Sequence, residues 1–234
     1  EYISGDGTDL TITSGNDIIL AVGSSGSAYN PGAGGTSNTA FGKNAGDALT
    51  TNGNYNSFFG EEAGGATTTS DYNVAIGFDC LKSIVSGGEQ NTAVGALSGD
   101  ALTTGDANVF MGVGAGGATE DVDNAVMIGY IAGAGVMTSG ADGSVGVGHS
   151  ALNALTSGAD NVAVGFEAAK GITTGASNVA LGDSALATAD GAEARNIAIG
   201  YRAGGSINSD TAHDNVLIGT DAGKAELVQL LKML

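Results

Sequence analysis

Asn73-Val74-Ala75-Ile76-Gly77 is the stretch that decides the fold, because it recurs along most of the chain. Each copy has three mostly apolar residues before a glycine, and successive copies lie 17 to 19 residues apart. The eleven closing glycines are Gly42, Gly60, Gly77, Gly95, Gly112, Gly129, Gly148, Gly165, Gly182, Gly200 and Gly219. A near-constant interval predicts one structural unit per repeat.

An asparagine opens nine of the eleven copies. Stacked at the same place in successive units, these side chains are expected to form a ladder in which each amide bonds to the next. The residues of the predicted ladder are Asn38, Asn56, Asn73, Asn91, Asn108, Asn161, Asn178, Asn196 and Asn215. In the two looser copies Asn124 lies one residue further back, and Ser144 takes the asparagine position.

The three residues between asparagine and glycine have the character of a short β-strand. Residues two apart share one face of a strand, so the first and third of them are predicted to face the core. The third position forms the predicted core row, which consists of Phe41, Phe59, Ile76, Val94, Met111, Ile128, Val147, Val164, Leu181, Ile199 and Ile218. The residue between them is also never polar, which indicates that both faces are covered, the second one by another chain.

The rest of the repeat is made of small residues and turn residues. A small residue returns three positions after each closing glycine, as in Ala63 and Cys80, and predicts a tight corner or a narrow lumen. Turns such as Thr103-Thr104-Gly105 end the unit. Helical repeats need about 33 residues and a 3.6-residue rhythm. The pattern therefore predicts an all-β fold, a parallel β-solenoid (β-roll) of about eleven coils of 17 to 18 residues.

Both ends of the chain depart from the repeat. Residues 1–35 contain short apolar segments between Gly/Ser-rich turns and are predicted to form a β cap or adaptor before the repeat region, 36–223. Residues 224–234 lack glycine and place Leu227, Leu230, Leu231 and Leu234 on one face of an expected helix. This segment is either a cap of the solenoid or a trimerisation segment.

Composition excludes several classes of function. The chain has 42 glycines among 234 residues and a net charge of -18, so anionic nucleic acids and membrane surfaces would repel it. No apolar run is long enough for insertion into a membrane. Cys80 is the only cysteine, and we interpret it as a substitute for alanine in the small-residue position.

The motif resembles the head repeats of YadA-type trimeric adhesins, and resembles more closely the Asn-x-Ala-x-Gly-x-x-Ala-Gly repeats of bacteriophage tail fibres. The resemblance covers residues 38 to 223, although the coil here is longer than the adhesin coil. It implies a homotrimer of left-handed β-rolls on a virion tail fibre or another extracellular surface. It also implies a host-surface glycan or protein receptor, and a chain that is a cleaved product or a fragment.

No group of residues in the sequence indicates a catalytic site. His149 and His213 lie in turns without a recognisable nucleophile, and the carboxylates Glu61-Glu62 and Asp121/Asp123 occupy variable, turn-like positions. We therefore predict no catalytic site, no cofactor and no metal, so the protein is not expected to be an enzyme. Calcium at Asp121-Val122-Asp123-Asn124 or Asp6-Gly7-Thr8-Asp9 is a weaker alternative, since neither spacing matches a known calcium loop.

Three functions remain at the level of sequence. The first is a structural fibre segment that supports or contributes to host attachment. The second is an ice- or glycan-binding solenoid, although the Thr-Thr-Gly turns are missing near residues 119, 189 and 209. The third is a polysaccharide-degrading tailspike, which needs a pair of carboxylates in a groove.

Overall fold

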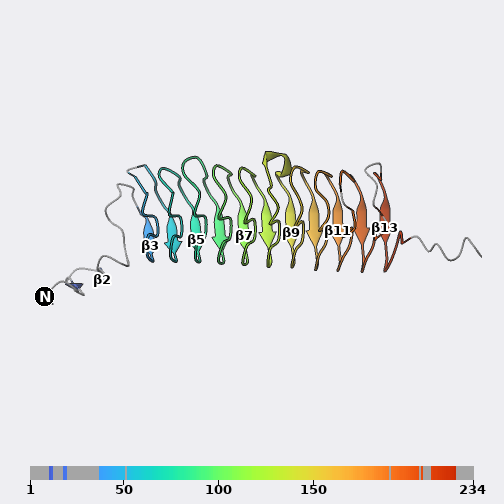
Figure 1. The fold of residues 1–234 in the computed structure, drawn as a ribbon, viewed down its shortest axis with the longest axis horizontal. Coiled ribbons are helices and arrows are strands. Elements are labelled where there is room, and N and C mark those ends of the chain that lie inside the picture. The colour runs from blue at the N-terminus through green and yellow to red at the C-terminus, as the bar shows by residue number, and fades with distance from the viewer. Residues whose placement is uncertain are drawn as a thin grey trace, which may run out of the picture. The chain divides into compact units, whose positions relative to one another are not determined.

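A computed structural model describes residues 37–50, 52–189, 191–205, 207 and 212–224, and the backbone of two short strands nearer the N-terminus. The chain divides into two compact units, residues 1–122 and 123–234. Among the described residues, each unit consists of stacked coils that contribute one three-residue strand each (Figure 1). The all-β, parallel β-solenoid predicted from the repeat is confirmed.

The strands of the solenoid coincide with the repeated motif. In the first unit they are β3 (Thr39–Phe41), β4 (Ser57–Phe59), β5 (Val74–Ile76), β6 (Thr92–Val94) and β7 (Val109–Met111). In the second unit they are β8 (Val126–Ile128), β9 (Val145–Val147), β10 (Val162–Val164), β11 (Val179–Leu181), β12 (Ile197–Ile199) and β13 (Val216–Ile218). A single 3-10 turn, η1 (Ser139–Ala141), interrupts the β structure of the described residues.

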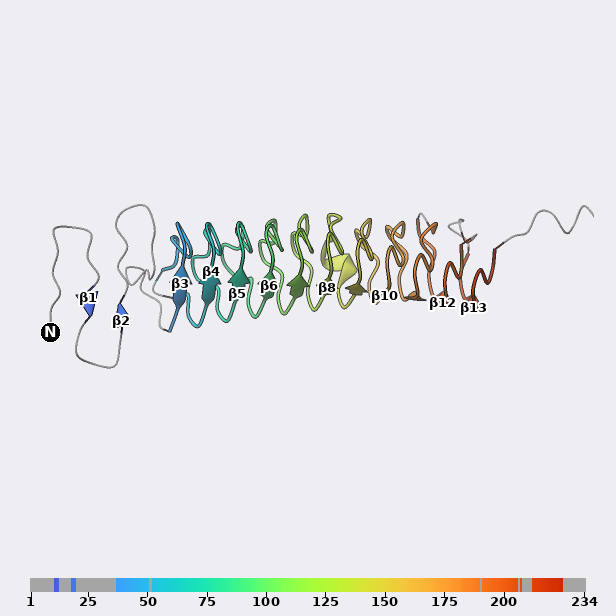
Figure 2. The ribbon, with the colours of Figure 1, turned by 90° about the horizontal axis from the view of Figure 1, so that it is seen from below.

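Neighbouring strands of the solenoid within each unit are parallel and in register. In the pair β10 and β11, for example, Val162 lies opposite Val179 and Ala163 lies opposite Ala180. Equivalent positions of the repeat therefore form columns along the stack, as the view in Figure 2 also shows. A residue type that recurs in the sequence becomes a row of identical groups one coil apart.

The predicted core row was assigned to the wrong face. In every strand from β3 to β12 the middle residue is buried and both flanking residues are partly or fully exposed. The side chains of Phe41, Ile76 and Val164 are 51%, 41% and 40% exposed, whereas Ala75 and Phe110 are completely buried. The row from Phe41 to Ile218 thus lies on the outer face of the sheet, because the coil closes on the side of the middle residue.

The small residues after each glycine do line the lumen, as predicted. Ala63, Cys80, Ser98 and their counterparts as far as Ala203 are buried. A second buried row was missed by the sequence analysis and lies just before the Thr-rich turn. Its members include Leu49, Thr67, Ile84, Leu102, Thr119, Met137, Leu155, Ile172, Ala189 and Ile207.

Two positions of the lumen compensate each other in size: where one holds a large side chain, the other holds a small residue. Where the middle strand residue is large, as in Phe58 and Phe110, the position four residues after the closing glycine is itself glycine, Gly64 and Gly116. A Cβ atom added to Gly116 would lie 2.8 Å from the Phe110 ring. Where that position is leucine, as in Leu81, the strand residue is small. The size of the side chain at one position therefore sets the size that fits at the other, and together they fill the core.

The ends of the chain are described only in part. β1 (Thr11–Ile12) and β2 (Ile18–Ile19) pair antiparallel, within two of the apolar segments predicted as strands. The remainder of the predicted N-terminal cap, residues 1–35, lies outside the described residues. So does the predicted helical segment beyond residue 224.

Candidate functional site

The asparagines form the predicted ladder within each unit. The Oδ1 atom of Asn91 accepts hydrogen bonds from the backbone N–H of Asn108 and from its Nδ2 amide, both at 3.0 Å. The Nδ2 amide of Asn91 donates to the carbonyl oxygen of Gly105 at 2.8 Å. Each asparagine thus joins its own turn to the neighbouring coil.

The same pattern recurs along the ladder. In the first unit, such bonds link Asn38, Asn56, Asn73, Asn91 and Asn108. In the second unit, they link Asn161, Asn178, Asn196 and Asn215. Ser144 takes an equivalent place, since its hydroxyl oxygen accepts a bond from the N–H of Asn161 at 3.3 Å. Most of these side chains are buried, so the bonds satisfy polar groups that would otherwise be costly.

The outer face of the sheet carries two rows of apolar side chains. In the first unit, Phe41, Phe59, Ile76 and Met111 are each at least 40% exposed. In the second unit, Ile218 and Val216 reach 67% and 65%, and the β-branched residues of β8 to β11 are partly exposed. Monomeric soluble proteins rarely expose contiguous apolar surface of this kind. The face is therefore a candidate protein interface.

A further outward row follows the closing glycines and contains stacked rings. The His149 imidazole lies between Tyr130 and Phe166, with ring centroids 5.3 and 5.0 Å away. His149 is thus packed between aromatic rings of the two neighbouring coils. In another row of the first unit, Tyr55 and Tyr72 stack at 4.9 Å. His213 has a structural contact: its Nδ1 atom accepts a hydrogen bond from the backbone N–H of Ala194 at 3.1 Å.

The carboxylates considered for catalysis have structural contacts. Glu61 forms an ion pair with Lys43 at 3.0 Å, and Glu62 accepts a hydrogen bond from the amide of Asn44 at 2.6 Å. The backbone N–H of Asp123 donates a hydrogen bond to the Oδ1 atom of Asp142. Asp121 also has an interaction with a partner. These contacts do not assemble a pair of carboxylates around a common groove.

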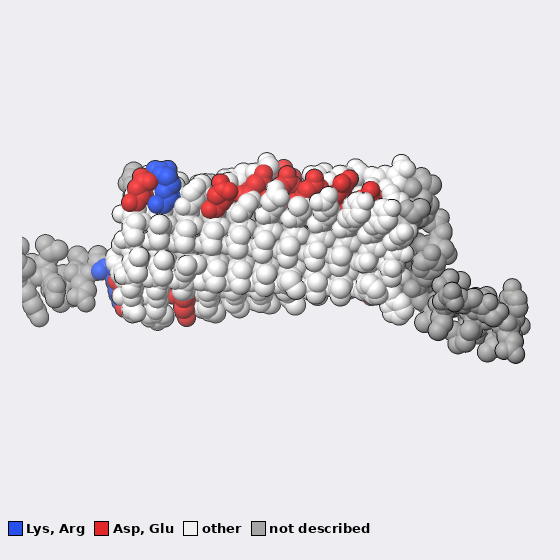
Figure 3. Space-filling model, turned by 180° about the vertical axis from the view of Figure 1, so that it is seen from behind, with Lys and Arg blue, Asp and Glu red and all other residues white. Residues whose placement is uncertain are grey.

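Acidic side chains also form a row before the asparagine ladder. The Oδ1 atoms of Asp71, Asp106 and Asp142 accept bonds from the backbone N–H groups of Asn54, Glu89 and Asp123, at 2.6, 2.7 and 2.9 Å. Acidic side chains gather along one margin of the face seen in Figure 3. Part of the negative charge therefore has a structural use, since it joins turns of successive coils.

Cys80 occupies the small-residue row and behaves as an interior group. It is fully buried, and its thiol donates to the carbonyl oxygen of Ala93 at 3.3 Å. Burial raises the pKa of the Cys80 thiol to about 12. At neutral pH the group is therefore a thiol and not the reactive thiolate.

The threonine turns do not offer a free plane of hydroxyl groups. The Oγ1 atoms of Thr50, Thr103 and Thr156 donate to the carbonyl oxygens of the neighbouring coils at 2.8 to 2.9 Å. Val85 and Glu120 interrupt this row. These donors link coils to one another, which argues against the ordering of water by an unbroken threonine array.

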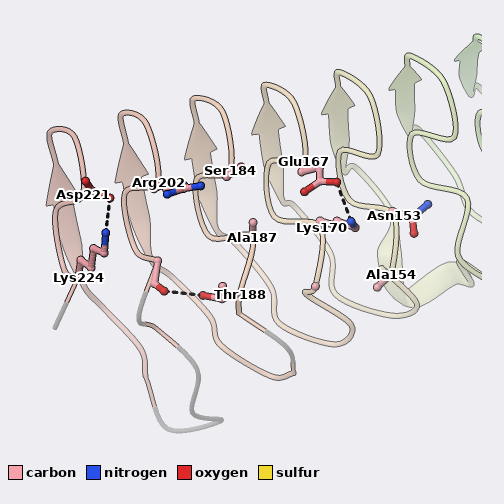
Figure 4. Close-up of a pocket in the computed structure, with 12 residues that line it drawn as sticks. Asn153, Ala154, Glu167, Lys170, Ser184, Ala187, Thr188, Arg202, Asp221 and Lys224 are labelled. Carbon is pink, nitrogen blue, oxygen red and sulfur yellow. Dashed lines mark hydrogen bonds and ion pairs between the residues drawn. The ribbon is translucent and has the colours of Figure 1, made fainter. Parts of the chain in front are cut away.

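A groove in the second unit has a volume of about 670 Å³. Figure 4 shows that its side chains come from the turns that follow the strands of successive coils. Lys170 pairs with Glu167 at 2.8 Å, and Lys224 pairs with Asp221 at 3.5 Å. Arg202 lies between these two pairs along the groove (Figure 4).

Neither metal ligation nor a membrane span is indicated in the part of the chain that the structure describes. It holds no group of three or more His, Cys, Asp or Glu side chains arranged around a common point. It also holds no helix long and apolar enough to cross a bilayer. The second calcium candidate, Asp6 to Asp9, lies outside the described residues.

The pKa values of Asp100 and Asp214 are shifted in opposite directions, so the two residues are expected to affect the dependence of stability on pH in opposite ways. Burial raises the pKa of Asp100, so its ionised form costs stability at neutral pH and this cost vanishes as the pH falls below the raised value. The hydrogen bond from Arg195 lowers the pKa of Asp214, so its contribution is lost as the pH falls through that value. At neutral pH we expect Asp100→Asn to raise the melting temperature and Asp214→Asn to lower it.

Thermal unfolding followed by circular dichroism at neutral and strongly acidic pH tests both signs. Each variant should approach the wild type at acidic pH, where the aspartates are protonated in the folded and unfolded states. An Asp100→Asn protein that is less stable than the wild type at neutral pH would contradict the assigned effect of burial.

Comparisons with protein-family models, with curated protein sequences and with solved structures give no match to this chain. The repeat and the geometry of its coils therefore carry the functional argument alone.

Proposed function

We propose that the protein is a structural segment of a phage tail fibre or surface adhesin. In this proposal three copies assemble through the outer faces of their sheets, outside the cell, and support or contribute to attachment to a host surface. The resemblance of the repeat supports the fibre assignment.

The observation that carries the proposal is the exposed apolar face. Ile76 and Met111 of the first unit and Val164 of the second are each 40 to 41% exposed in the single chain. Burial of such side chains against a second copy contributes about 25 cal/mol for every Å² removed from water. A three-fold assembly would cover this face and leave the turns in solvent.

Light scattering of the purified full chain tests the assembly. The wild type is expected at three times the chain mass of 22.6 kDa. Val164→Glu should reduce the mass to that of one chain while the β signal in circular dichroism remains, since each interface would bury an unpaired charge. Thr174→Glu adds the same charge at an exposed turn and should remain trimeric.

Two outcomes would refute the trimer. One is a wild-type chain that is folded and monomeric at all concentrations. The other is a Val164→Glu variant with the same mass as the Thr174→Glu control.

A further inference from the structure

We propose that the groove of the second unit binds an extended oligosaccharide that carries carboxylate groups, an acidic glycan. The inference rests on the proposed role in surface attachment, and it assigns that role a binding site and a ligand class. The groove is lined by residues from five successive coils, from Asn153 to Lys224. At about 4.8 Å per coil this length is roughly 20 Å, enough for a chain of several sugars.

Positive charge is concentrated in this groove. The whole chain has 7 lysines and arginines, and Lys170, Arg202 and Lys224 are three of them. A ligand would meet these cations on a protein whose net charge is -18. Most other surfaces of the chain therefore repel anions, whereas this groove offers local attraction to separated negative groups.

Arg202 is the central recognition group. Lys170 and Lys224 each have a carboxylate partner three residues earlier, but no ion pair holds Arg202 among the described residues. The Arg202 guanidinium lies 5.0 Å from the centroid of the Tyr201 ring, which supports its position by a cation–π contact. Its planar fork of N–H donors matches the two oxygens of a carboxylate.

The acidic residues of the groove favour binding of a sugar chain over binding of a more densely charged polyanion. Glu167 and Asp221 lie beside the cations, so closely spaced phosphates would be repelled. Carboxylates that repel phosphates accept hydrogen bonds from sugar hydroxyl groups. The alternation of both charges thus fits a ligand with many hydroxyl donors and few anionic groups.

The shape of the groove agrees with this ligand. Small residues, Ala154, Gly171, Ala187 and Gly205, contribute to its lining and leave room for sugar rings between the longer side chains (Figure 4). None of the outward side chains of the strands lines it. Assembly through the sheet and binding in the groove therefore use different residues.

Isothermal titration calorimetry on the full chain tests the site with defined probes. A hyaluronan fragment carries a carboxylate on alternate sugars, an oligogalacturonate carries one on every sugar, and a chito-oligosaccharide of equal length carries none. We expect at least one carboxylated probe to bind about tenfold or more tightly than the neutral one, with weaker binding at high salt. Inorganic polyphosphate should bind more weakly than that probe.

Arg202→Gln should weaken binding of the carboxylated probe about tenfold or more, because it removes the charged hydrogen-bond donor. Lys43→Gln removes an equal charge in the first unit and should leave the affinity unchanged. Circular dichroism and light scattering on the same samples establish that both variants are folded and have the wild-type mass.

The inference is overturned if neither carboxylated probe binds, if the neutral probe binds equally, or if polyphosphate binds more tightly. It is also overturned if Arg202→Gln and Lys43→Gln have the same affinity as the wild type. Because the mass is measured separately, a monomeric chain that binds the glycan would refute the trimer and leave the groove assignment intact.

Discussion

Replacement of Gly165 by alanine is expected to destabilise the protein by about 4 kcal/mol or more, a loss found when a substitution cannot be accommodated. Gly165 closes the coil of β10 with φ near +141°, a conformation that side chains rarely adopt. A Cβ atom there would lie 2.4 Å from the carbonyl oxygen of Gly182 in the neighbouring coil. The coils are therefore stacked too closely for any side chain at this position.

Gly219 provides a matched control because it has the same place in the last coil. Its φ is +125°, but a Cβ atom added there has no described neighbour within 4 Å. Gly219→Ala is therefore expected to lower the free energy of unfolding only through backbone strain, by about 1 to 3 kcal/mol. Thermal melting and hydrogen exchange of both variants separate the two effects.

Equal losses in the two glycine variants would show that backbone strain alone fixes glycine at the closing position. A Gly165→Ala protein with the wild-type melting temperature would contradict the close approach of neighbouring coils.

Truncation of Phe110 to alanine is expected to cost about 3 to 5 kcal/mol through the cavity that it leaves. Phe110 is the largest type of side chain in the lumen and is completely buried. Its ring occupies the space next to Gly99 and Gly116, since a Cβ atom at either place would lie 2.8 Å from it. Chemical denaturation compared with Phe78→Ala, an exposed phenylalanine, measures this loss.

Because these two core positions compensate each other in size, we expect a larger residue at one of them to restore part of the stability lost by truncation at the other. Leu81, Leu152 and Leu186 occupy the position of Gly116 in coils whose middle strand residue is small, and they share its positive φ. The double variant Phe110→Ala/Gly116→Leu should therefore recover part of the stability, whereas Gly116→Leu alone should be destabilising. Additive losses in the double variant would contradict this packing rule.

Much of the fold follows from local pattern. The spacing of the glycines predicted the coils because each coil must return to the same point of the stack, where a residue such as Gly165 has neither the space nor the φ for a side chain. The asparagine row predicted a ladder because identical amides one coil apart present a donor to an acceptor. These features depend only on neighbouring copies of one motif.

The groove was not predicted from the sequence. Lys170 and Lys224 each lie five residues after a closing glycine, whereas Arg202 lies two residues after another. These cations are 22 or more residues apart, so no contiguous motif joins them. Their proximity follows only when coils are stacked and the small residues between them leave space. The second core row, which includes Leu102 and Ile172, was equally missed, although its position before the threonine turn recurs in the sequence.

The sequence by itself determined the repeat, the strands and the place of each glycine and asparagine, because these depend on backbone geometry and on hydrogen bonds between equivalent groups. Only the tertiary structure decided which face of the strand is inside. Ala75 and its neighbours Val74 and Ile76 are all apolar, so no polar alternation marks the outer face. Closure of the coil around the middle residue turned the two flanking side chains outward, and the surface that the sequence assigned to the core became the candidate interface.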